Sequence, residues 1–106
     1  MDKWYIYCLI LENNHFFINR ATNKTLPKLI RKHTKGTGGW FTNKHKVIAH
    51  EILQELPRST PLTDVDKTVN EYVLSYMETY GTDNVRGGGY SQQTPKWPTD
   101  PLIWIR

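Results

Sequence analysis

Residues 4–11 read Trp-Tyr-Ile-Tyr-Cys-Leu-Ile-Leu, a run of aromatic, β-branched and other apolar side chains that is typical of a buried β-strand. The run stops at the polar residues 12–14, and a second stretch with strand character begins at His15 and continues to Asn19. Two such stretches joined by a short polar turn predict a β-hairpin. We expect this hairpin to form the centre of the fold.

Two helices are predicted downstream of the hairpin by the spacing of their apolar residues. The first, over 26–34, has Pro27 in its first turn and places its apolar residues and His33 on one stripe. The second, over 63–80, carries a longer continuous stripe. Residues 47–56 satisfy neither period cleanly and are predicted to be a strand from their β-branched content. Together these elements predict an α+β fold with a small, mostly antiparallel sheet flanked by helices.

A chain of 106 residues corresponds to one small domain. We expect the domain to span residues 1–94 and a tail to span 95–106, in which residues 102–105 are predicted to be a docking strand. Two ordered loops are expected at 40–46 and 83–90. The second loop is rich in glycine but lacks the Gly-Lys-Ser/Thr ending of a phosphate-binding P-loop.

Cysteine usage and hydropathy indicate an intracellular protein in a reducing compartment. The single cysteine, Cys8, lies in the apolar run and cannot form an internal disulfide, so we expect a small core residue and not a reactive thiol. The longest apolar run is far too short to span a bilayer, and no small-residue cleavage site follows it. No membrane partner is therefore expected.

Positive charge is concentrated in the first half of the chain. Between Asn13 and His50 there are eight Lys and Arg residues and all four histidines, but no Asp or Glu. From Glu51 onward, eight acidic residues outnumber five basic ones. Such segregation favours an anionic partner, because clustered Lys and Arg neutralise phosphates and release counterions. A basic surface that serves solubility alone is the alternative.

The cations of the 26–34 helix share one face. At about 100° per residue they fall opposite the apolar stripe, and no acidic residue is available there for i, i+4 pairing. The 40–46 segment sets aromatics beside bases, a combination that can stack nucleobases and hold phosphates or can pack a tryptophan over a core edge. The expected nucleic-acid contacts are Lys28, Arg31, Lys32, Lys35, Trp40, Lys44, Lys46 and Arg86.

The order of these motifs resembles the GIY-YIG nuclease domain. The likeness covers roughly residues 4–91 and includes Tyr-Ile-Tyr in the first strand, Phe-Ile-Asn-Arg in the second, and a basic helix that ends at His33. A closing Tyr-Gly-Thr-Asp-Asn-Val-Arg-Gly-Gly run is similar to small single-domain members, several of them from large DNA viruses. The resemblance implies phosphodiester hydrolysis by hairpin tyrosines, a helix arginine, and a glutamate that binds one divalent metal ion.

The signature residues of the hairpin match only in part. Tyr7 matches the first signature tyrosine, and Tyr5 is the alternative in a shifted register. The second tyrosine falls on Phe17, which has no hydroxyl for proton transfer, and the signature glycine falls on Asn19. His33 matches the histidine that closes the helix.

The charged groups of the family's site are displaced. The arginine position falls on Leu29, so that Arg20 or Arg31 would have to substitute. The metal-ligand position falls on Val73, and the alternative carboxylate, Glu71, lies nearly opposite the apolar stripe by the 100° count. The resemblance therefore implies a domain that keeps nucleic-acid binding, with DNA favoured over RNA, and has lost or weakened its metal-dependent cutting.

Two other functions remain open at this stage. An active nuclease would need Tyr7, Arg20 and Glu71 to converge in one pocket with Mg²⁺ or Mn²⁺; otherwise no cofactor is expected. A protein-interaction module would use the basic face to dock an acidic protein partner. Salt-dependent DNA binding separates the nucleic-acid hypotheses from the protein-interaction hypothesis.

Overall fold

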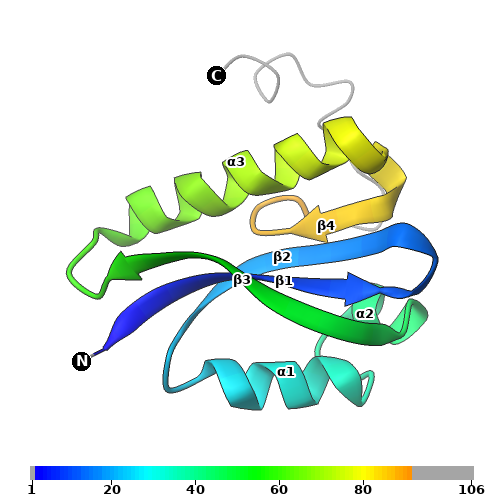
Figure 1. The fold of residues 1–106 in the computed structure, drawn as a ribbon, viewed down its shortest axis with the longest axis horizontal. Helices are drawn as coiled ribbons and strands as arrows, with labels where there is room; N and C mark the ends of the chain where they lie inside the picture. Colours follow the sequence, from blue (N-terminus) through cyan, green and yellow to red (C-terminus); the bar gives the residue numbers. More distant parts are fainter. Residues whose placement is uncertain (1, 92–106) are drawn as a thin grey trace.

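The sheet contains four strands: β1 (Lys3–Leu11), β2 (His15–Thr22), β3 (Val47–Pro57) and β4 (Val85–Gly87). They lie in the order β3-β1-β2-β4, with β1 antiparallel to β2 and β3, and β2 parallel to β4. Helix α3 (Leu62–Tyr80) covers one face of the sheet, and α1 (Leu26–Thr34) and α2 (Trp40–Lys44) lie on the other (Figure 1). The predicted α+β class and the mostly antiparallel sheet are confirmed.

This computed structural model describes residues 2–91. The predicted tail at 95–106 and its docking strand at 102–105 lie outside the described residues. None of the helices in the described part of the chain is long and apolar enough to cross a membrane.

Strand β1 lies between β2 and β3 and is covered on both faces. Side chains alternate along it, so that Ile6 and Cys8 pack towards α3 while Tyr7 and Leu9 pack towards α1 and α2. Burial on both sides explains why the run is apolar throughout instead of alternating with polar residues. Cys8 is fully buried, and burial raises the pKa of its thiol to about 12, as expected for a core residue and not a nucleophile.

The hairpin turn spans Glu12–Asn14 and carries the label η1, although its backbone is kinked and is not regular 3-10 helix. Asn13 and Asn14 both have a φ of 59°, a left-handed conformation that asparagine tolerates better than most residues. The backbone N–H of Glu12 donates to the carbonyl oxygen of Lys46 at 2.9 Å, which ties the turn to the start of β3. The predicted hairpin is confirmed, and it lies in the middle of the sheet.

Both predicted helices form with their apolar stripes facing the sheet. Leu26 and His33 are buried on α1, and α3 buries four members of its predicted stripe. Tyr80, which the helical spacing places at the end of that stripe, is 42% exposed, whereas Leu74, which lies outside the predicted stripe, is buried. Helix α3 begins at Leu62, one residue before the predicted start, and its N-terminus has no side-chain cap.

Two predicted loops contain regular structure. Residues 40–44 form α2, which buries Phe41 against the underside of the sheet. The predicted glycine-rich loop contains β4, preceded by the 3-10 turn η2 (Thr82–Asn84). Gly87 has a φ of +147°, and a Cβ there would overlap the carbonyl oxygen of Ile18 on β2. Only glycine lets β4 approach β2 this closely.

We predict that Gly87→Ala destabilises the fold by about 3 kcal/mol, because the methyl group meets the β2 backbone at a φ that disfavours side chains. Gly89→Ala is the matched control, since its Cβ would lie at an ordinary 3.6 Å from Asn70. Urea unfolding midpoints should separate the two variants. Equal midpoints would show that β4 is not held by this contact.

Candidate nucleic-acid interface

The outer face of α1 carries four cations. The helix docks through Leu26 and His33, and the residues on its opposite side therefore face solvent. Within residues 2–91 none of these cations forms an ion pair with a carboxylate. They are the exposed residues Lys28, Arg31, Lys32 and Lys35, as predicted.

A groove of about 420 Å³ lies between the inner side of this basic face and the end of β2. Three of its lining side chains are cationic, and no carboxylate lines it. The remaining lining groups include two threonines and an indole ring. These six residues are Arg20, Lys28, Lys32, Thr22, Thr25 and Trp4.

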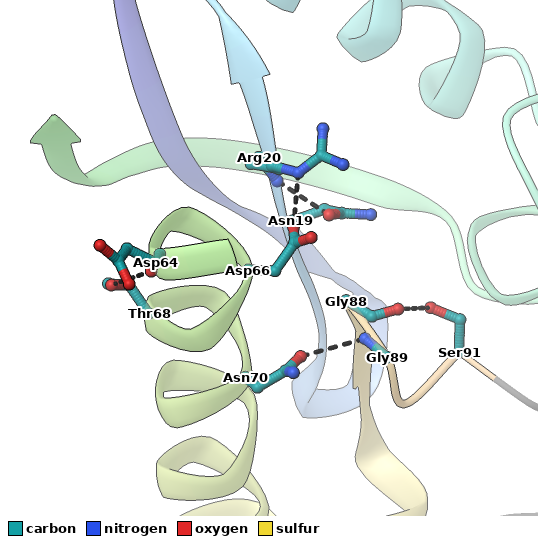
Figure 2. Close-up of polar contacts among 9 residues, drawn as sticks. All are labelled: Asn19, Arg20, Asp64, Asp66, Thr68, Asn70, Gly88, Gly89 and Ser91. Atoms are coloured by element: carbon teal, nitrogen blue, oxygen red, sulfur yellow. Dashed lines mark hydrogen bonds and ion pairs between the residues drawn. The ribbon is translucent and has the colours of Figure 1, made fainter. Parts of the chain in front are cut away.

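Arg20 reaches the groove from β2 and is held in place by two contacts. Its Nε donates to Oδ1 of Asp66 on α3 at 2.6 Å (Figure 2). Its guanidinium carbon lies 5.3 Å from the centre of the Trp4 ring, and that of Arg58 lies 4.5 Å from the same ring. Cations over an indole ring are attracted by its π system, so Trp4 supports both arginines.

The hydroxyl-bearing candidate Tyr7 lies inside the protein. Its side chain is 2% exposed, and burial raises its pKa to about 12, although nearby Arg20 lowers it slightly. Tyr7 therefore keeps its proton at neutral pH. Tyr5, the alternative, is half-buried on the same face of β1.

His33 and Phe17 meet beneath α1, with their ring centres 4.8 Å apart. The Nδ1 atom of His33 lies 2.6 Å from Oγ1 of Thr42 on α2, and burial lowers the pKa of the imidazole. The structure thus places Tyr7, Phe17 and His33 on one side of the sheet. The His33 ring is held there by the hydroxyl of Thr42 and by contact with Phe17.

Glu71 lies apart from these three residues. It is exposed on α3, which covers the opposite face of the sheet from Tyr7 and His33. The carboxylate that meets Arg20 is Asp66, which the sequence reasoning missed. Arg20 and Asp66 are 46 residues apart in the sequence, so no local pattern predicts their contact. Within residues 2–91 no group of three or more His, Cys, Asp or Glu side chains is placed to hold a metal ion.

The predicted contacts outside α1 and β2 divide into exposed and buried residues. Lys44 and Lys46 are exposed, as expected. Trp40 is half-buried and its indole N–H donates to the carbonyl oxygen of Ser91 at 2.6 Å. Arg86, also expected among the nucleic-acid contacts, is buried and only 3% exposed.

The reason that Arg86 is buried lies in its neighbours. Its guanidinium donates to the carbonyl oxygens of Thr82 and Val85 and lies against the rings of Trp40 and Phe41. Arginine is well suited to this position because five N–H donors can satisfy backbone carbonyls while the planar head stacks on aromatic rings. Burial lowers the pKa of Arg86.

Comparison with protein-family models, with curated proteins and with solved structures gave no match.

We predict that the free energy of unfolding falls as the pH drops below about 6.5, the usual pKa of histidine, because unfolded His33 binds a proton that the folded state excludes. One such group contributes a slope of at most about 1.4 kcal/mol per pH unit. Urea titrations between pH 5 and pH 7.5 should give a shallower dependence of the unfolding free energy on pH for His33→Gln than for the unmodified protein. A slope unchanged by His33→Gln would contradict a buried neutral imidazole.

Proposed function

We propose that this chain binds nucleic acid through the outer face of α1 and the adjoining groove, and that its metal-dependent cutting is lost or severely weakened. The observation that carries the proposal is the row of exposed cations on α1, Lys28, Arg31, Lys32 and Lys35, none of which forms an ion pair within residues 2–91. Arg20 adds a further cation in the adjoining groove. Cations concentrated in this way suit a polyanion.

The dimensions of the basic face fit a phosphate backbone. Lys28 and Lys35 are seven residues apart, so the face runs for about 10 Å along the helix axis. One strand of duplex DNA carries a phosphate about every 3.4 Å along its axis, which places about three phosphates within reach of the face. DNA is favoured over RNA on the likeness to the GIY-YIG nuclease domain.

The proposed weakness in catalysis rests on the chemistry of the residues at the signature positions. Tyr7 is buried and protonated, and Phe17 has no hydroxyl. Leu29 provides no charge, and Glu71 lies beyond the opposite face of the sheet. Phosphodiester cleavage needs a proton acceptor and positive charge at the same phosphate, which these residues do not provide together.

We predict that replacing Lys28, Arg31, Lys32 and Lys35 by Gln weakens binding to a DNA duplex and flattens its salt dependence. Each lost phosphate contact removes about 0.9 from the slope of log K against log salt. Fluorescence anisotropy at several salt concentrations measures both quantities.

The control replaces Lys3 on β1 and Lys67 on α3, both exposed, by Gln. For each charge removed, this control should change the slope of log K against log salt less than the α1 variant does. Unchanged affinity and slope in the α1 variant would instead favour docking of an acidic protein on this face.

We also predict that Mg²⁺ or Mn²⁺ produces little strand cleavage by the purified protein. Loss of a single electrostatic stabiliser costs on the order of 100- to 1000-fold in rate, and several groups differ here. Supercoiled plasmid and single-stranded oligonucleotides with each metal provide the assay, with Tyr7→Phe alongside. Metal-dependent cutting that disappears in Tyr7→Phe would mean that the protein is an active nuclease.

A further inference from the structure

We propose that Arg20, Lys28 and Lys32 form a phosphate subsite in the groove and that Asp66 sets its affinity by competing with the phosphate for Arg20. This inference deepens the proposed function and rests on it. It assigns Arg20, which lies on β2 and not on the basic helix, as the phosphate ligand with fixed geometry. It also assigns a role in binding to an acidic residue on α3.

Arg20 has hydrogen-bonding capacity left over. Its Nε is used by Asp66, whereas its two terminal nitrogens have no hydrogen-bond partner within residues 2–91. Figure 2 shows these two nitrogens turned away from Asp66. Together they carry four N–H donors in one plane, the arrangement that binds a phosphate through two parallel hydrogen bonds.

The direction of the Arg20 head is fixed before any ligand arrives. The Trp4 ring supports one side of the guanidinium, and the Asp66 carboxylate holds its Nε. Trp4 is itself 9% exposed, so the support is anchored in the protein. A preorganised side chain loses less conformational entropy on binding than a free one. Lys28 and Lys32, one helical turn apart on the other wall, add two mobile charges.

Asp66 has a second effect besides orienting Arg20. At 2.6 Å its charge offsets much of the positive charge of Arg20, and both side chains are partly exposed, so an incoming anion can reach the pair. A phosphate at the terminal nitrogens lies near a carboxylate of the same sign, which lowers its affinity. Removal of the Asp66 charge should therefore strengthen binding, provided that Arg20 is the ligand.

Asp64 provides a matched control for this effect. It lies on the same helix two residues earlier and is exposed, and within residues 2–91 its side chain forms no ion pair. Figure 2 shows it turned away from Arg20, with its backbone carbonyl accepting a hydrogen bond from Thr68. Asp64→Asn and Asp66→Asn change the net charge equally, but only the second removes the partner of Arg20.

The experiment measures the affinity of the full chain for a short DNA duplex by fluorescence anisotropy. Arg20→Gln should weaken binding by about 10-fold, the cost of a lost charge-assisted contact, and Arg20→Lys should weaken it less. Asp66→Asn should tighten binding several-fold more than Asp64→Asn. When Arg20 is also replaced by Gln, Asp66→Asn and Asp64→Asn should have equal effects on the affinity for DNA. If Asp66→Asn and Asp64→Asn change the affinity equally while Arg20 is present, the proposed role of Asp66 is overturned.

Two forms of the duplex identify the source of the phosphate. An Arg20→Gln effect of equal size on duplexes with 5′-hydroxyl and 5′-phosphate ends supports a backbone phosphodiester as the ligand. An effect confined to the 5′-phosphate form supports a terminal phosphate. No effect of Arg20→Gln or Arg20→Lys on either duplex, while the four-residue α1 variant loses binding, would overturn the subsite and leave the proposed function standing.

Failure of the unmodified protein to bind DNA would overturn the proposed function itself, and inorganic phosphate then tests the groove alone. The indole N–H resonance of Trp4, beside Arg20, should move on addition of phosphate and should not move in the Arg20→Gln variant. A resonance that stays unchanged in the unmodified protein would overturn the subsite as well.

Discussion

The pairing of β1 with two antiparallel neighbours is the constraint on which the rest of the structure depends. It divides the side chains of one strand between two cores, with Ile6 and Cys8 on the α3 side and Tyr7 and Leu9 on the α1 side. A shift of one residue in this register would exchange the two cores and place a phenol where a thiol now fits. The alternation also explains why Tyr7 lies on the α1 side of the sheet, away from α3 and its Glu71.

The contrast between the two faces of α1 explains why a basic helix is stable in this position. Apolar contacts of Leu26 hold the helix on the sheet, and the hydrogen bond between His33 and Thr42 joins it to α2, so the outer residues of α1 are not needed for packing. Like charges one turn apart repel one another, which costs a few tenths of a kcal/mol per pair. Under the proposed function, an anion bound between the lysines would relieve that repulsion, so the residues that slightly destabilise the free helix would favour the bound state.

The sequence predicted the elements whose patterns are local and failed where the deciding contacts are distant. The two hairpin strands follow from their strand-forming composition, and α1 and α3 follow from a period of three to four residues. The bounds of β1, α1 and α3 agree with the prediction to within one residue, whereas β2 continues three residues beyond the predicted end at Asn19. The short strand β4 could not be predicted, because it depends on the fit of Gly87 against Ile18. The contact of Arg86 with Trp40 and the ion pair of Arg20 with Asp66 likewise join residues that are distant in the sequence. No local sequence pattern predicts such contacts. For the candidate site, exposure of the α1 cations was predictable, whereas the groove was not.

The parallel pairing of β2 with β4 also orders events during folding. Phe16 and Val85 are far apart in the sequence, so pairing them closes a long loop. The loss of chain entropy is larger than for the hairpin, whose strands are joined by three residues. Strand β4 lies at the edge of the sheet beside β2 and packs against α3, so its pairing depends on both of these elements. We therefore expect β4 to join the sheet late and to open more readily than β1, with faster exchange of its amide protons.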